Sequence, residues 1–432
     1  MKKLTMFLLA ALTLSSAATA QAFKLDVDGN KKKIASSDAD IQNAKKNAKA
    51  GTWETRGKVY YNAEIAPIGP LYLGMDPTTA TLLLGNPSER RTETTAQGEF
   101  NVSVYPHFDL YFANNQLMYW KQKTVIAENG LDVAFEAYTK AAELDPKLAP
   151  KVKPEILKLV DQYKQKGNNA YGAGDFADAA LNFAKAYDFS ISPLVAAPDS
   201  MSAFNAGYLY TVSQDYELAL KYLDQALALG YYGNEGDLYY YRYVAYYTGL
   251  KDMEKAEQSL KDGIQKFPAN SQLIGELITF YTNTGQDASQ MIPMVEEALQ
   301  RDPDNHVFYF GLGLIYTRLG DFDKAIESFK KASELDSQDF SSAYNVGLTY
   351  LSKADAMLPE INSIPVNEQA LYNEKMGEFN ALYKEAIPFF EKAHALNSTE
   401  PITIELLRSI YFRFRDESPE MMANYEKFNA MM

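Results

Sequence analysis

Four polar side chains of this sequence have the chemistry to bind a carboxylate group: Lys164, Asn168, Asn205 and Arg242. Lysine and arginine donate charge-assisted hydrogen bonds to carboxylates, and asparagine amides add neutral donors. If successive helices carry these residues on the same face, we expect them to converge on one concave surface. Such a positive site would be distinctive, because the formal net charge of the chain is −14.

Aromatic side chains are expected on the same concave surface. They are Phe204, Tyr208, Tyr241, Phe310 and Tyr344. Exposed rings that line a concavity suit extended peptides or sugar rings. Ordinary core packing is the alternative explanation for these rings. In the same way, structural hydrogen bonds between neighbouring helices are the alternative for the two asparagines.

The sequence offers little for catalysis. The three histidines lie far apart and lack metal-ligand spacing: His107, His306 and His394. No nucleophile elbow, phosphate-binding loop or dinucleotide fingerprint occurs. The chain has no cysteine, which excludes disulfides, thiol catalysis and thiolate metal sites. We therefore predict no catalytic residue and no cofactor.

One short run begins like a calcium-binding loop. Asp26-x-Asp28-x-Asn30 places oxygen ligands at the first, third and fifth positions, but Lys31 stands where a glycine is required. We interpret the run as a polar turn within a flexible N-terminal segment at residues 21–39. No metal site is predicted.

The elements that must position these side chains follow a 34-residue repeat, which is complete at residues 306–339. Small residues, Gly313 and Ala325, stand where two antiparallel helices cross, and Gly320-Asp321 makes the turn between the helices. The pattern resembles the tetratricopeptide repeat (TPR). Such a unit cannot bury its apolar face alone, so copies must stack into a solenoid.

The resemblance predicts an all-α TPR superhelical solenoid with a small α/β insertion near the N-terminus. The expected divisions are a split first TPR at 40–62 and 130–148, the insertion at 63–129, TPRs at 149–199, 200–236, 237–270, 271–305 and 306–339, a split TPR with a helical insertion at 340–399, and capping helices at 400–432.

In TPRs, positions 2, 5, 6, 9 and 12 of each first helix face the concave side. This register places the four polar residues and five aromatic residues there. The polar set resembles the carboxylate clamp of chaperone-binding TPR domains, which grips the terminal carboxylate of a peptide. The sequence departs from that clamp at Leu238, which stands where the clamp has a second lysine.

The insertion contains one short helix and several strand-like runs. Asp76-Pro77 begins a helix that ends at Leu84, and the strand-like runs are Glu99–Tyr105, Leu110–Phe112 and Gln116–Lys121. Asn114-Asn115 is at a hairpin-turn position. This order resembles the small SmpA/OmlA-type module of outer-membrane assembly lipoproteins. An unrelated α/β insertion is the alternative.

The first twenty residues predict a secretory signal peptide. Lys2 and Lys3 precede an apolar run, and Ala18-Thr19-Ala20 is a small-residue cleavage site. Without a cysteine the protein is not expected to be a lipoprotein. The long insertion in the penultimate repeat and the Leu407-x-x-x-Tyr411 cap resemble a group of secreted TPR proteins of Gram-negative bacteria, which implies a periplasmic interaction scaffold.

These observations predict a non-enzymatic periplasmic scaffold that binds a protein or peptide through its concave groove. The acidic balance opposes nucleic-acid binding, and no segment predicts a transmembrane helix. An alternative is an accessory factor in outer-membrane protein assembly or transport, in association with outer-membrane complexes. A third hypothesis, from a different class, is a glycan-binding or enzymatic groove.

Overall fold

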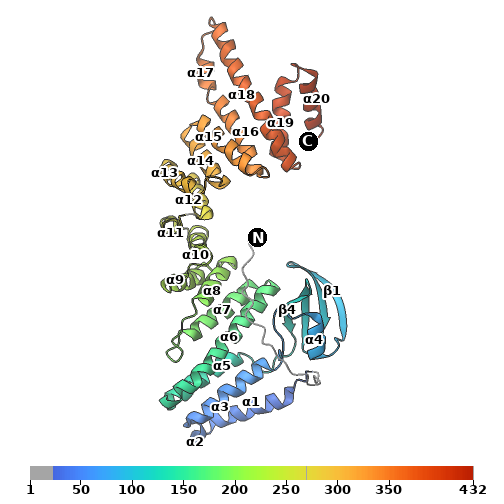
Figure 1. Cartoon of the computed structure of the whole chain (residues 1–432), viewed down its shortest axis with the longest axis vertical. Helices are drawn as coiled ribbons and strands as arrows, with labels where there is room; N and C mark the ends of the chain where they lie inside the picture. The colour runs from blue at the N-terminus through green and yellow to red at the C-terminus, as the bar shows by residue number, and fades with distance from the viewer. Residues whose placement is uncertain (1–22, 269, 432) are drawn as a thin grey trace. The chain divides into compact units, whose positions relative to one another are not determined.

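The computed structural model describes residues 23–268 and 270–431, and the contacts within the chain divide it into two compact units, residues 1–231 and 232–432 (Figure 1). The predicted signal peptide at residues 1–20 lies outside the described residues. Each unit is built mainly of antiparallel helices that follow one another along the chain.

The first unit contains eight helices besides the insertion among its described residues. They are α1 (Val27–Gln42), α2 (Ala44–Asn47), α3 (Ala50–Ile65), α5 (Gly130–Leu144), α6 (Ala149–Ala173), α7 (Phe176–Ser190), α8 (Ser200–Val212) and α9 (Tyr216–Ala228). Helix α3 packs against α5, and α6 to α9 pack in sequence order. The split first repeat therefore closes across the insertion.

The second unit continues with helices alone. They are α10 (Asp237–Val244), α11 (Met253–Lys266), α12 (Ser271–Thr284), α13 (Ile292–Arg301), α14 (His306–Leu319), α15 (Phe322–Leu335), α16 (Phe340–Asp355), α17 (Leu358–Ser363), α18 (Gln369–Leu396), α19 (Pro401–Phe414) and α20 (Pro419–Asn429). A π-helical turn over Ala245–Leu250 extends α10. Helix α16 pairs with the long helix α18.

A glycine in the first helix of several repeats lies against a large side chain of the second helix. A Cβ atom on Gly313 would lie 2.5 Å from the ring of Phe329, and one on Gly347 would lie 2.8 Å from the ring of Phe390. The same relation holds for Gly57 and Tyr138. These close approaches explain the recurrence of glycine. They confirm the predicted architecture of paired helices.

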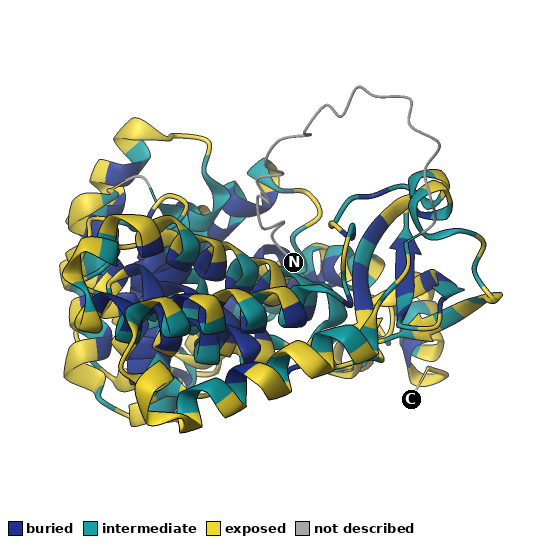
Figure 2. Ribbon diagram, turned by 90° about the horizontal axis from the view of Figure 1, so that it is seen from below, coloured by how far each residue is buried: buried dark blue, intermediate teal, exposed yellow. Residues whose placement is uncertain are grey.

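An aspartate begins the second helix of successive pairs. Asp175, Asp215, Asp252 and Asp321 each accept a hydrogen bond from the main-chain N–H three residues later. This side-chain oxygen satisfies one of the N–H groups that a helix start leaves without a partner. Burial follows the same helices, with buried residues on one side and exposed residues on the other (Figure 2).

The insertion folds as helix α4 (Pro77–Leu84) and a four-stranded antiparallel sheet in the order β1-β2-β3-β4. The strands are β1 (Glu89–Thr95), β2 (Gly98–Val104), β3 (Phe108–Ala113) and β4 (Gln116–Gln122). Asn114 and Asn115 have positive φ at the β3–β4 turn. One face of the sheet packs on α4 through Phe108, Leu110 and Trp120.

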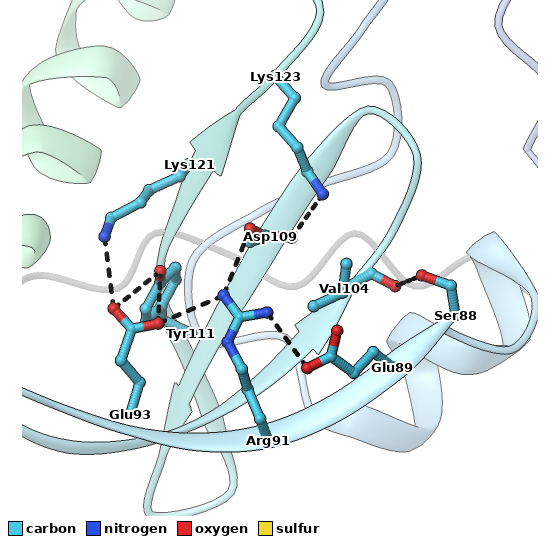
Figure 3. Close-up of polar contacts among 9 residues, drawn as sticks. All are labelled: Ser88, Glu89, Arg91, Glu93, Val104, Asp109, Tyr111, Lys121 and Lys123. Atoms are coloured by element: carbon cyan, nitrogen blue, oxygen red, sulfur yellow. Dashed lines mark hydrogen bonds and ion pairs between the residues drawn. The ribbon is translucent and has the colours of Figure 1, made fainter.

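Strand β1 was not predicted from the sequence. It reads Glu-Arg-Arg-Thr-Glu-Thr-Thr and carries no apolar alternation. It pairs with β2 along its whole length, and ion pairs add to this, because Arg91 lies 3.4 Å from Glu93 and 3.7 Å from Asp109 of β3, while Asp109 also pairs with Lys123 at 2.7 Å (Figure 3). The hydroxyl of Tyr111 donates to Glu93 at 3.2 Å.

The expectation of a flexible segment at residues 21–39 was wrong for its helical part. Residues 27–42 form α1, which packs against α3. Asp26 caps the helix, since its Oδ1 accepts from the N–H of Gly29 at 2.9 Å. Asp38 pairs with Arg56 at 2.6 Å and accepts from the hydroxyl of Tyr60 at 2.7 Å. The calcium-like run is thus a helix start and not a turn.

Candidate functional site

A groove of about 220 Å³ lies between α12 and α14 in the second unit. Helix α14 supplies Phe310, one of the aromatic residues predicted for the concave surface. Around it, both helices contribute lining residues: Ser271, Gln272, Gly275, Glu276, Ile278 and Thr279 from α12, and Val307, Gly311 and Leu314 from α14.

The lining residues stand at positions that face the concave side in TPRs. Counted from residue 271, positions 2, 5, 6 and 9 are Gln272, Gly275, Glu276 and Thr279; counted from residue 306, they are Val307, Phe310, Gly311 and Leu314. Residues three and four apart share a helical face, so these side chains open toward the same side. The groove lining thus coincides with positions that the predicted register assigns to the concave side in these two repeats.

Two glycines shape the floor of the groove. A Cβ atom on Gly275 would have one neighbour within 4 Å, Cγ1 of Val307 at 3.3 Å. The space beside Gly275 is therefore open. At Gly311 the space that a side chain would need is occupied by Ile278, because its Cδ1 would overlap a Cβ atom at that position. The result is an apolar floor beneath a polar wall.

Glu276 is the charged residue of this groove. Its carboxylate is half-buried, and burial raises its pKa above the ordinary value of 4.5. The charge of Glu276 contributes to the raised pKa of Tyr240 and Tyr243, after the larger effect of burial. No described residue forms a hydrogen bond or an ion pair with this carboxylate. Sequence reasoning missed Glu276, although the same position rule finds it.

The predicted clamp residues are divided between the units. Lys164 on α6, Asn168 on α6 and Asn205 on α8 belong to the first unit, and Arg242 on α10 belongs to the second. All four side chains are half-buried. The guanidinium carbon of Arg242 lies 5.8 Å from the ring centre of Tyr246.

Lys164 already holds two carboxylates of its own chain. Its Nζ lies 3.2 Å from Asp161 and 3.2 Å from Asp199. Burial opposes the charge of Lys164, but Asp199 and Asp161 outweigh it and raise the pKa. Asp199 also caps α8 by accepting from the N–H of Ser202 at 3.0 Å. A ligand carboxylate would have to replace one of these partners, and the clamp stays a prediction.

Of the rings predicted for the aromatic surface, Phe310 lines the groove, whereas Phe204 is buried. Phe204 is 7% exposed and packs against Tyr231, with ring centres 5.4 Å apart, because the chain after α9 covers it. Phe310 meets Phe329 edge to face at 5.4 Å and keeps part of its surface in the groove. Tyr344 stacks on Phe340 at 5.4 Å.

The other two aromatic residues are partly exposed. Tyr208 is half-buried, and burial together with Tyr171 raises its pKa to about 12. Tyr241 is half-buried beside Tyr240, with ring centres 5.5 Å apart. Their role in binding stays a prediction.

The insertion is fixed to the helices by Asn169, which sequence reasoning also missed. Its Oδ1 accepts from the main-chain N–H of Trp120 at 2.9 Å, and its Nδ2 donates to the carbonyl of Trp120 at 3.1 Å. Nearby, Lys166 pairs with Glu64 at 2.8 Å beside a cavity of about 90 Å³.

Among the described residues, no cluster of side chains suits a metal ion.

Comparisons with known proteins agree with this architecture. The family model for the tetratricopeptide repeat matches residues 307–339. The protein CTR9 homolog of Arabidopsis thaliana is 23% identical over 302 residues, which cover 67% of this chain and 26% of that protein. The matched region therefore spans about a quarter of this curated relative.

Two of the solved structures that this chain matches are described as tetratricopeptide-repeat proteins. A TPR repeats protein from Bacteroides fragilis is 18% identical with a TM-score of 0.28, and the alignment covers 63% of this chain and 99% of that one. A tetratricopeptide repeat protein from Parabacteroides merdae is 18% identical with a TM-score of 0.38, covering 58% and 97%. Residues 307–339 of this chain therefore form a tetratricopeptide repeat, and further antiparallel helix pairs stand before and after it.

Proposed function

We propose that this protein is a non-enzymatic scaffold that binds a protein or peptide partner in the groove between α12 and α14. The observation that carries the proposal is the lining of that groove. Eight of its residues occupy the concave positions of two successive repeats, and together they present open apolar surface beside polar side chains. Side chains of an extended segment suit a surface of this kind.

Site-specific photo-crosslinking tests the proposal. A small aliphatic diazirine amino acid, which leaves the groove open, replaces Thr279, which is exposed and lines the groove, or Glu254, which is exposed on α11 and lies outside the lining. In cells, a specific partner should be captured from position 279 and not from position 254. Equal capture from both positions, or no capture from position 279, would count against the groove.

We also propose that the protein acts in the periplasm. The basic, apolar and small-residue order of residues 1–20 supports export. Among the described residues, no helix has the length and apolar character needed to cross a bilayer. Mass spectrometry of the protein from an osmotic-shock fraction should give an N-terminus at Gln21. An N-terminus at Met1 in a cytoplasmic fraction would contradict export.

The alternative proposal is an accessory role in outer-membrane protein assembly. The order of a short helix and then an antiparallel meander supports it, since the insertion has α4 followed by β1 to β4. Deletion of the insertion, residues 63–129, should then lower the amounts of outer-membrane proteins. Unchanged membrane profiles in cells that lack the insertion would remove this alternative.

A further inference from the structure

Glu276 is a half-buried carboxylate without a partner in a groove that is otherwise open. A buried or half-buried charge is normally paired, because removing it from water is unfavourable unless a counter-charge or donor replaces the lost hydration. No described residue forms a hydrogen bond or an ion pair with the Glu276 carboxylate, and its charge therefore points to a group that a ligand would bring.

We propose that the α12–α14 groove recognises a protein segment in which a lysine or arginine lies next to an apolar residue, with the cation on Glu276. This inference rests on the proposed function of the groove and names the chemistry of its partner. The partner is a basic and apolar extended segment, as opposed to an acidic peptide or a free C-terminus.

One wall of the groove is polar and the opposite wall is apolar. On α12, Gln272 lies one turn before Glu276 and Thr279 one turn after it, which makes this wall polar. On α14, Val307, Phe310 and Leu314 make the opposite wall apolar. A segment with alternating basic and apolar side chains would meet both walls at once.

Glycine leaves the space that such side chains need. Position 275 has no side chain and the groove is open beside it, in the turn that carries Glu276. Ile278 fills the corresponding space at Gly311, which gives the apolar floor against which the aliphatic stem of a lysine would lie. The ammonium or guanidinium group would then donate charge-assisted hydrogen bonds to Glu276.

Electrostatics favour this partner over the opposite charge. The ionisable neighbours of Glu276, Tyr240 and Tyr243, stay neutral near pH 7 because burial raises the pKa of both. They do not compensate the carboxylate. The chain as a whole carries a formal net charge of −14, which steers basic partners toward it. An acidic segment would face repulsion both at long range and at Glu276.

Fluorescence anisotropy with three matched peptides tests the inference. Each peptide is acetylated and amidated, with alternating alanine and leucine around a central lysine, norleucine or glutamate. The protein is the full mature chain, as wild type, Glu276→Gln, Glu276→Lys, Thr279→Trp to fill the groove, and Glu254→Gln. The last variant is the matched control, because it removes an exposed carboxylate outside the groove.

We expect wild type to prefer the lysine peptide. Glu276→Gln should weaken that peptide roughly 10-fold, the effect of one charge-assisted hydrogen bond, and leave the norleucine peptide unchanged. Glu276→Lys should reverse the preference toward the glutamate peptide. Glu254→Gln should leave all three affinities unchanged, and Thr279→Trp should weaken all three.

Two other outcomes would overturn the inference in distinguishable ways. If Thr279→Trp weakens binding while Glu276→Gln and Glu276→Lys alter no preference, the groove binds peptides but does not select a cation. If no peptide binds and no partner is crosslinked from position 279, the groove function itself fails as well.

Discussion

Gly313 lies where the two helices of a repeat, α14 and α15, approach each other closely. A Cβ atom there would lie 2.5 to 2.7 Å from three atoms of the Phe329 ring, which is 1% exposed and has no room to move. Gly313→Ala should therefore destabilise the protein by about 1–3 kcal/mol, the usual penalty for overpacking a core, and lower the melting temperature by a few degrees.

Gly377→Ala is the control for this prediction. Gly377 lies within α18, and a Cβ atom there would have no neighbour within 4 Å. Alanine is favoured over glycine inside a helix by roughly 0.5–1 kcal/mol, so this variant should melt slightly higher than wild type. Thermal melts followed by circular dichroism give both values. A Gly313→Ala protein as stable as wild type would contradict the close crossing.

Glu276 should make stability depend on pH with a defined sign. Its pKa is raised in the folded state, so the folded state binds this proton more tightly than the unfolded state does. The resulting stabilisation is complete below pH 4.5 and is lost as the pH rises through the folded pKa. At pH 7 the ionised carboxylate is then unfavourable, and Glu276→Gln should melt higher than wild type by a degree or so.

The difference between Glu276→Gln and wild type should shrink toward zero at pH 4, where both side chains are neutral. Glu254→Gln should melt no higher than wild type at pH 7, because that carboxylate is exposed and lies in the first turn of α11, where a negative charge is favourable. A lower melting temperature for Glu276→Gln at pH 7 would mean that the carboxylate has a stabilising partner. If Glu276→Gln is more stable than wild type but binds the lysine peptide more weakly, Glu276 serves binding at the expense of stability.

At the scale of elements, Asn169 holds the edge of a sheet against a helix. Its side chain bonds both main-chain groups of Trp120, which is 6% exposed, and so replaces a further strand beside β4. Asn169→Ala would leave the N–H and the carbonyl of Trp120 without their partner. Each unsatisfied group should lower the free energy of unfolding by about 1–3 kcal/mol. Hydrogen exchange should accelerate in residues 116–122 while α6 stays protected.

The neighbouring Asn168→Ala is the control for the sheet edge. Asn168 lies on the same helix at similar burial, and the hydrogen bonds to the main chain of Trp120 come from Asn169. Exchange in β4 should therefore match wild type in that variant. If the amides of β4 exchange as slowly in Asn169→Ala as in Asn168→Ala, contacts other than the amide of Asn169 hold the insertion.

The elements that sequence reasoning found and missed differ in how their side chains are used. Helix α4 and strands β2 to β4 were predicted because apolar residues and turn residues mark them. Strand β1 and helix α1 were missed because both are largely polar. Arg91 and Asp38 join them to the fold through ion pairs with partners distant in sequence, and no local pattern reveals such pairing.

At the scale of the whole molecule, the repeat register predicts which positions face the groove but not what surrounds them. Phe310 lines the groove at a position that this register assigns to the concave side, and the corresponding positions of α12 include Glu276. The rule failed at Phe204, which the chain after α9 covers. Whether a charge has a partner, or whether a glycine leaves a hollow, depends on packing between repeats that periodicity alone does not contain.

The division of the chain into two units predicts that each folds separately. Two core clusters illustrate the division, one with buried residues from Tyr60 to Val195 and another with buried residues from Ala325 to Phe428. Contacts within repeat proteins are mainly between neighbouring repeats, so each half keeps most of its stabilising contacts. Expressed alone, residues 21–231 and 232–432 should each be helical and melt cooperatively by circular dichroism.

A second split, after Gly285, is the control for this prediction. It lies inside the second unit and separates α12 from α14, which pack against each other and form the groove. The fragment 232–432 should bind the lysine peptide as the full chain does, and neither product of the inner split should bind it. If 232–432 fails to melt cooperatively, the second unit depends on residues before it. If it folds but does not bind the peptide that the full chain binds, the groove needs groups that lie outside this unit.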